Sequence, residues 1–243
     1  SIHEGAISLK FGVPGIKSES ESVHVKRGCE YSMQTGCHFH VLHVSTKNSL
    51  KYVRQAKANG ANVTCEVSPH HLLLCDEDIK TREDGTLDSN FKMNPPLRGK
   101  EDRQACIDAF LDGTIDFVAT DHAPHSPQEK ARHITEAPFG IVGVETAFEL
   151  LYTHFVKTDK MSLERLIDMM TINAAKVFNL PYGDIKEGGS ADLVIIDLEK
   201  SETIDSNTFL SKGKNTPFND WECFGIPMLT IFNGKVVYRN GEF

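Results

Sequence analysis

The segment from Phe117 to His125 carries residue types that are typical of a hydrolytic metal site. An apolar run ends at Asp121, and His122 and His125 follow on a loop that contains Pro124. α/β barrels place catalytic groups at the carboxyl ends of their strands, where a carboxylate can lie beside a metal ion. A strand buried on both faces excludes a charge within its run but accepts one at its end. We therefore favour a catalytic role for Asp121 over the alternative, in which it only caps a helix.

His43 also follows an apolar, strand-like run, and it is a second candidate ligand. Together, His43 and Asp121 are suitable ligands for zinc or manganese. Zinc hydrolases use three or more protein ligands and a water, so further ligands must come from elsewhere.

Other histidines are weaker candidates. His38 and His40 alternate on one strand, but they lie at its amino end, opposite the end where barrels carry out catalysis. We interpret them as a polar strand edge. His70 and His71 follow Pro69 at the start of a helix or turn, and we expect them to be exposed or packed rather than bound to metal.

Three further features are candidates for contacts with a substrate. Pro95-Pro96 would hold the backbone of Asn94 rigidly, so its side chain is placed to hydrogen-bond an amide or carbonyl. Arg98 suits either a substrate carboxylate or a surface salt bridge. The segment Ala137-Pro138-Phe139-Gly140-Ile141 offers backbone N–H groups to a ligand or forms a plain turn.

The composition is that of an ordinary globular protein. The 243 residues are 40% hydrophobic and 25% charged, and the formal net charge of -8 argues against nucleic acid or an anionic membrane as partner. We find no apolar run long enough to span a bilayer and no secretory signal pattern. Six cysteines without a C-x-x-C pair suit a reducing cytosol, so we expect a cytoplasmic location.

The hydrophobic periodicity predicts alternating strands and helices, followed by a β-rich tail. Helices are expected at 22–33, 49–59, 101–112, 144–156, 162–170 and 173–178. Strands are expected at 39–44, 62–67, 116–120, 192–197, 228–232 and 235–238. The βα order predicts parallel strands, and Asn233-Gly234 predicts a hairpin in the tail. Three parallel strands cannot close a barrel, so the body is either an open sheet or the later part of a barrel.

Several motifs resemble those of bacterial class I dihydroorotases and stand in the same order. These motifs are His43-Val44-Ser45-Thr46, Ser68-Pro69-His70-His71-Leu72, Lys92-Met93-Asn94-Pro95-Pro96-Leu97-Arg98, Ala119-Thr120-Asp121-His122-Ala123-Pro124-His125, Ala137-Pro138-Phe139-Gly140, Gly188-Gly189-Ser190-Ala191-Asp192-Leu193 and Ser211-Lys212-Gly213-Lys214-Asn215-Thr216-Pro217-Phe218. The similarity covers nearly the whole chain. Hydantoinases and allantoinases share the tail and the final aspartate, but not the full set.

The resemblance implies the amidohydrolase fold, a (β/α)8 TIM-type barrel with a small β domain. We therefore expect residues 1–187 to be the C-terminal portion of the barrel and residues 188–243 to be part of an appended, β-sandwich-like module. His43 looks like the metal-binding histidine after the sixth strand, and Asp121 like the catalytic aspartate after the eighth, which binds metal and moves the proton. Asn94, His125 and the backbone of Phe139-Gly140 look like substrate contacts.

The implied reaction is the reversible, zinc-dependent cyclisation of N-carbamoyl-L-aspartate to L-dihydroorotate in pyrimidine synthesis. The resemblance also implies one or two zinc ions in an intact site, a small-molecule substrate and a homodimer. The alternatives are another cyclic-amide hydrolase, such as a hydantoinase, or a non-catalytic partner protein related to dihydroorotases.

The sequence departs from the family in one respect. The family's His-x-His pair, its bridging carboxylate, its fifth-strand histidine and the arginine that binds substrate have no counterpart here. All of them precede the sixth strand in the family. We therefore expect this chain to be the C-terminal part of a longer enzyme, and we expect it to be inactive alone.

Overall fold

The computed structural model describes residues 1–242, and the contacts within the chain divide it into two compact units. The first unit comprises residues 1–145 and 206–217. The second comprises residues 146–205 and the chain from residue 218 onward.

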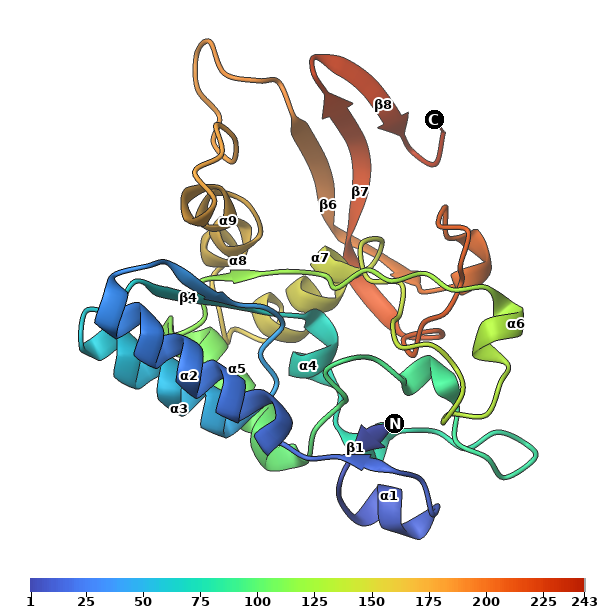
Figure 1. The fold of residues 1–243 in the computed structure, drawn as a ribbon. Helices are drawn as coiled ribbons and strands as arrows, with labels where there is room; N and C mark the ends of the chain where they lie inside the picture. The colour runs from blue at the N-terminus through green and yellow to red at the C-terminus, as the bar shows by residue number, and fades with distance from the viewer. Residues whose placement is uncertain (243) are drawn as a thin grey trace. The chain divides into compact units, whose positions relative to one another are not determined.

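A parallel sheet in the strand order β3-β4-β5 is the centre of the first unit. Its strands are β3 (Phe39–Val41), β4 (Val63–Val67) and β5 (Phe117–Val118). The connecting helices are α3 (Lys47–Ala58) and α5 (Lys100–Asp112), and α2 (Glu19–Thr35) precedes β3. These three helices lie side by side along one face of the sheet (Figure 1). The expected parallel βα arrangement is thus confirmed.

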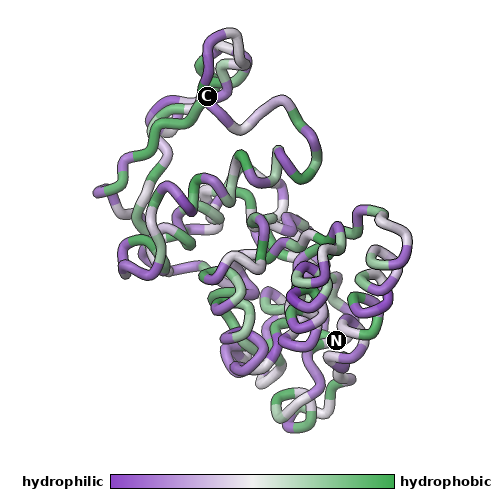
Figure 2. Tube along the Cα trace, turned by 90° about the vertical axis from the view of Figure 1, so that its left-hand side faces the viewer, coloured by the Kyte–Doolittle hydropathy of each residue, from purple (hydrophilic) through white to green (hydrophobic). Residues whose placement is uncertain are grey.

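Helix α3 shows why these segments fold as they do. The Thr46 side chain accepts a hydrogen bond from the backbone N–H of Ser49 and so caps the first turn. Leu50, Val53 and Ala56 recur at helical spacing, and all three are buried. In Figure 2, green and purple stretches alternate along such helices, as expected when one face packs against a sheet.

Several short elements of the first unit were not expected from the sequence. They are the parallel pair β1 (Ile2–His3) and β2 (Gly15–Ile16), with α1 (Ala6–Lys10) between them. Two 3₁₀ turns lie between α4 (Pro69–Leu73) and α5, namely η1 (Asp76–Asp78) and η2 (Ser89–Phe91). A further 3₁₀ turn, η4 (Ser206–Thr208), and the short helices α4 and α6 (Pro127–Lys130) complete this unit.

The second unit combines helices with an antiparallel sheet. Its helical elements are α7 (Ala147–Leu151), a π-helical turn at Tyr152–Val156, α8 (Leu163–Met170) and α9 (Ile172–Val177). Its strands, in the order β6-β7-β8, are β6 (Leu193–Thr203), β7 (Glu222–Phe232) and β8 (Lys235–Arg239). Asn233 and Gly234 both have positive φ, 50° and 76°, which is the conformation of a type I′ hairpin turn. The predicted hairpin is confirmed.

The architecture is therefore α/β, as predicted. The partial barrel, the appended module and the boundary after residue 187 stay predictions. Among residues 1–242, no helix combines the length and the apolar character needed to cross a membrane.

Candidate functional site

His43 and Asp121 each follow the carboxyl end of a strand in the parallel sheet. His43 comes two residues after β3, and Asp121 comes three residues after β5. Both have a left-handed backbone, with φ of 33° and 49° respectively. This conformation is uncommon for residues other than glycine, and it ends the extended strand abruptly. Strands β3 and β5 end at Val41 and Val118, earlier than the apolar pattern predicts, and the left-handed residue follows each strand within three positions.

The two side chains interact electrostatically. Burial raises the pKa of the Asp121 carboxyl, the nearby His43 ring opposes this rise, and the Glu66 carboxylate adds to it. The Nδ1 atom of His43 is buried and has no hydrogen-bond partner among residues 1–242. A buried ring nitrogen without a partner is costly unless something else binds it. His43 and Asp121 therefore form one site, and its polar atoms are incompletely satisfied.

This donor pair suits a metal ion but does not complete a coordination sphere. An imidazole nitrogen and a carboxylate are both common zinc ligands, and the unpartnered nitrogen of His43 is consistent with such a role. No group of three His, Cys, Asp or Glu side chains that could hold a metal exists within residues 1–242. The described residues thus fit two positions of a metal site.

Glu66 lies next to this pair, and the sequence analysis did not identify it. Its Oε1 accepts a hydrogen bond from the backbone N–H of His43 at 3.2 Å, and its Oε2 lies 3.2 Å from Nε2 of His40. Glu66 is 6% exposed within the apolar strand β4. A charge within a buried strand was itself the signal that could have found it.

His38 and His40 lie at the outer strand β3, as expected for a polar strand edge, and His40 also makes contacts inside the sheet. Nδ1 of His40 lies 2.8 Å from the Thr64 hydroxyl, and its ring stacks on Phe117 with centroids 5.1 Å apart. The His38 ring is exposed and also reaches the Thr64 hydroxyl, at 2.7 Å. His40 is thus part of a polar network that leads to Glu66.

Arg98 stabilises the loop after His43 and is not a surface residue. It is 3% exposed, its Nε donates to the Ser45 hydroxyl at 3.1 Å, and its guanidinium lies 3.8 Å from Glu21. Glu21 in turn accepts hydrogen bonds from the backbone N–H groups of Ser45 and Thr46, both at 3.1 Å. The carboxylate that pairs with Arg98 is thus that of Glu21, and this pair is buried rather than at the surface.

His70 and His71 are packed inside the first unit. Burial lowers the pKa of both rings, so both are neutral at physiological pH. Nε2 of His71 donates to the Pro95 carbonyl at 3.0 Å, because a carbonyl can only accept. This bond anchors the loop that carries Asn94, whose side chain is exposed and whose peptide bond to Pro95 is cis.

The structure brings His125, Phe139 and Gly140 together. Nε2 of His125 donates to the Phe139 carbonyl at 2.8 Å. Gly140 has φ of 128°, and a Cβ atom there would lie 2.4 Å from Cβ of Ala123. Only glycine allows this close approach. The three residues therefore form a second cluster, on the loops that follow Asp121.

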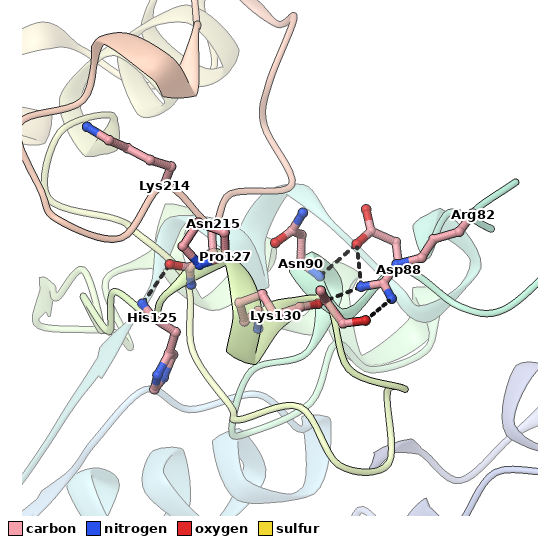
Figure 3. Close-up of a pocket in the computed structure, with 9 residues that line it drawn as sticks. Arg82, Asp88, Asn90, His125, Pro127, Lys130, Lys214 and Asn215 are labelled. Carbon is pink, nitrogen blue, oxygen red and sulfur yellow. Dashed lines mark hydrogen bonds and ion pairs between the residues drawn. The ribbon is translucent and has the colours of Figure 1, made fainter. Parts of the chain in front are cut away.

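A pocket of about 510 Å³ borders this second cluster (Figure 3). Its lining residues are Arg82, Asp88, Asn90, His125, Pro127, Lys130, Ala131, Lys214 and Asn215. In Figure 3 the Asn215 side chain points toward the backbone of His125. Asn215 and Lys130 were not among the predicted site residues.

Comparison with known proteins identifies close relatives in sequence. The chain is 57% identical over 242 residues to a dihydroorotase of Bacillus subtilis (strain 168), a match that covers all of this chain and 55% of the relative. It is 55% identical over 240 residues to a dihydroorotase of Brevibacillus brevis, with 99% of this chain and 55% of the relative covered. The chain thus spans about half the length of the curated relatives it matches.

Solved structures with the same fold are more distant in sequence. The dihydropyrimidinase of Brevibacillus agri NCHU1002 superposes with a TM-score of 0.87 at 25% identity, over 98% of this chain and 52% of that one. A D-hydantoinase from Thermus sp. gives 0.86 at 30% identity, with the same coverage. The sequence model of the amidohydrolase family matches residues 2–237, almost the entire chain. Because this match covers nearly the whole chain, which also carries a histidine and an aspartate at its strand ends, the chain belongs to the amidohydrolase family.

Proposed function

We propose that this chain forms part of the active site of a metal-dependent dihydroorotase. Two observations support the proposal. His43 and Asp121 interact with each other after two strands of one parallel sheet. The chain also shares 57% identity with a bacterial dihydroorotase along its whole length. The convergence of His43 and Asp121 carries the argument, because the reaction needs a metal ligand beside a proton carrier.

The reaction assigns distinct tasks to the protein groups. In the hydrolytic direction, the oxygen of water bonds to the ring amide carbon of dihydroorotate, and the C–N bond breaks. Asp121 accepts the proton that the water loses and delivers it to the leaving nitrogen, which gives N-carbamoyl-L-aspartate. Ring closure is the reverse, with loss of water. His43 and Asp121 would hold the metal, which when bound polarises the amide carbonyl and lowers the pKa of the attacking water.

Asp121 is suited to this task by its surroundings. Burial raises the pKa of its carboxyl, which favours the uptake of a proton by this group. The positive φ of Asp121 directs the chain away from the strand at that point. The side chain is thereby presented at the strand end rather than within the sheet.

The substrate contacts proposed are Asn94, His125 and the backbone of Phe139-Gly140. His125 and Gly140 lie on two loops that meet, and Asn94 lies on a loop anchored by His71. A dianionic substrate of this size needs polar groups at several points, and backbone N–H groups and amides supply them without a large desolvation cost.

The finer assignments belong to this proposal as well. They are zinc as the metal, one or two ions per intact site, a homodimer, a cytoplasmic location, and a (β/α)8 barrel of which residues 1–187 form the later part. Residues 188–243 would form part of the small β module.

The test is an activity assay on the complete polypeptide that carries this sequence. We expect reversible conversion of dihydroorotate to N-carbamoyl-L-aspartate, lost on chelation and restored by zinc. Hydantoin is the comparison substrate, because the structural relatives include hydantoinases. Activity on hydantoin but not on dihydroorotate would replace our assignment with the alternative. No turnover of either substrate, despite bound metal, would favour a non-catalytic partner protein.

A second arm uses a polypeptide limited to residues 1–243. We expect weak metal binding and no turnover, because the described residues fit only two positions of a metal site. Dihydroorotase turnover by this polypeptide would overturn that expectation.

A further inference from the structure

The carbonyl oxygen of Gly140 accepts hydrogen bonds from two side chains that come from separate parts of the sequence. Nζ of Lys130 donates to it at 3.0 Å, and Nδ2 of Asn215 donates at 2.9 Å. Both side-chain donors are almost fully buried, since Lys130 is 4% exposed and Asn215 is 5% exposed. Buried polar groups of this kind are retained where they satisfy each other completely.

The Lys130 ammonium group is surrounded by backbone carbonyls. Besides Gly140, its Nζ donates to the carbonyls of Pro138 at 3.1 Å and Lys92 at 3.3 Å. A protonated lysine has three N–H donors, so the three carbonyls match its capacity. Two of the carbonyls, those of Pro138 and Gly140, flank Phe139. The lysine therefore fixes the path of the backbone on both sides of that residue.

The Asn215 side chain joins two loops. Its Oδ1 accepts the backbone N–H of His125 at 2.8 Å, while its Nδ2 bonds to Gly140 and, at 3.3 Å, to the Ala123 carbonyl. Its backbone carbonyl also accepts the N–H of Val142 at 2.8 Å. One residue thus ties the loop after Asp121 to the Phe139-Gly140 segment.

Gly213 brings Asn215 to this position. A Cβ atom at residue 213 would lie 2.5 Å from both the backbone N and the backbone O of His125. This contact requires glycine, and it places the segment 213–215 directly against the His125 loop. Figure 3 shows the Asn215 side chain beside the His125 backbone, joined to it by a hydrogen bond.

We propose that Lys130 and Asn215 are positioning residues that together fix His125 and the Phe139-Gly140 backbone for substrate binding. The proposal rests on the proposed function, which makes those three residues substrate contacts. Neither side chain needs to touch the substrate. Both donate to the Gly140 carbonyl, and Asn215 also accepts the His125 N–H, so the loss of either side chain removes one of the two side-chain hydrogen bonds that hold this carbonyl.

The experiment measures KM and kcat for dihydroorotate in the complete polypeptide and four variants, one of which is the conservative Lys130→Arg. Lys130→Met removes the donors at nearly constant volume, and Asn215→Asp keeps the acceptor for His125 but loses the donor to Gly140. Lys57→Met is the matched control. It also removes a lysine–carbonyl bond, to Thr114 at 2.8 Å, together with the ion pair to Asp116 at 2.6 Å, at the other end of the sheet.

We expect KM to rise at least about tenfold in Lys130→Met and Asn215→Asp, with a smaller change in kcat, because misplaced binding groups weaken affinity first. Lys130→Arg, which keeps the charge and the donors, should have a KM close to that of wild type. Lys57→Met should leave KM within about twofold of wild type. An unchanged KM in both Lys130→Met and Asn215→Asp, or an equal change in Lys57→Met, would overturn the proposal.

Amide hydrogen exchange gives a readout that is independent of activity. In Asn215→Ala, the N–H of His125 loses its acceptor, so a peptide that covers residues 123–126 should exchange faster than in Lys57→Met. A peptide that covers 138–142 should also exchange faster in Lys130→Met. If wild type does not turn over dihydroorotate, the proposed function fails, and hydrogen exchange alone tests whether Lys130 and Asn215 fix these two loops. Unaltered exchange in both peptides rejects it.

Discussion

Nε2 of His125 lies 2.8 Å from the carbonyl oxygen of Phe139. Since a carbonyl only accepts, this nitrogen carries the proton, and Nδ1 is the ring atom left to face a ligand. The bond also fixes the plane of the ring relative to Phe139. His125 is therefore a preorganised group, and its orientation depends on the loop that it binds.

We expect His125→Ala to weaken substrate binding more than turnover. The loss of one hydrogen bond to an anionic substrate should raise KM about tenfold, with a smaller fall in kcat. Steady-state kinetics on dihydroorotate measure this. His133→Ala is the control, because His133 is exposed and pairs only locally with Thr135. Identical KM values in the two variants would remove His125 from the site.

We expect Asp121→Asn to keep the fold and lose turnover, because an amide cannot carry the proton. General acid–base groups contribute about 10²–10⁴-fold to kcat, so the loss should be of this order or larger. Asp116→Asn is a control at the other end of β5. Its carboxylate accepts from Lys57 Nζ at 2.6 Å and from the Cys65 N–H at 2.8 Å. That variant should lower the melting temperature and largely retain kcat. Near-normal kcat in Asp121→Asn would refute the role of Asp121.

The pH dependence of substrate affinity should reflect Lys130. Burial, together with the nearby charges of Lys92 and Arg82, lowers the pKa of Lys130 to about 8, and Asp88 partly opposes this shift. Above this pH the neutral amine has two N–H groups and can no longer supply three carbonyls. KM should therefore rise with pH through about 8 in wild type and stay flatter in Lys130→Arg. A KM profile that is the same in both proteins would contradict this.

Lys130 should give stability the opposite pH dependence: as the pH rises, substrate affinity should fall, whereas the free energy of unfolding should increase. Between its native pKa of about 8 and the unfolded value of 10.5, Lys130 holds a proton in the unfolded chain but not in the native one. The contribution of Lys130 to the free energy of unfolding should therefore increase as the pH rises through that window. Urea denaturation of wild type and Lys130→Met at several pH values measures the difference. If the difference between the two does not vary between pH 7 and 10, Lys130 has an ordinary pKa.

We expect Glu66→Ala to destabilise the first unit. The substitution removes the acceptor for the His43 N–H and a partner of the His40 ring. Leaving buried polar groups unsatisfied costs about 2 kcal/mol in the free energy of unfolding. Chemical denaturation is the measurement, with Glu66→Gln as a milder variant that keeps one acceptor. A change within about 0.5 kcal/mol, as for an ordinary surface substitution, would show that Glu66 is dispensable.

The sequence predicted the regular elements well where apolar periodicity set them. Helices α3 and α5 and strand β4 lie within two residues of their expected bounds, because their buried faces follow helical or strand spacing. Strands β6 and β7 run longer than expected. Their extra pairs join polar residues such as Ser201 and Glu202 to Phe224 and Cys223, across a register shift that no apolar pattern indicates.

The sequence predicted the candidate site only in part, for a physical reason. His43 and Asp121 could be found because each ends an apolar strand, a signal local in sequence. Lys130 and Asn215 act on Gly140 from positions 10 and 75 residues away, and their partners are backbone carbonyls. A carbonyl is present at every residue, so no residue type marks such a contact in advance.

The left-handed backbone of His43 and Asp121 has a consequence for directed evolution. Glycine adopts positive φ without the steric cost of about 1–2 kcal/mol that other residues bear there. A library selected only for thermal stability should thus enrich glycine at both positions and yield more stable proteins that lack the proposed metal ligands. Selection for stability and selection for catalytic activity would then favour different residues at these two strand ends.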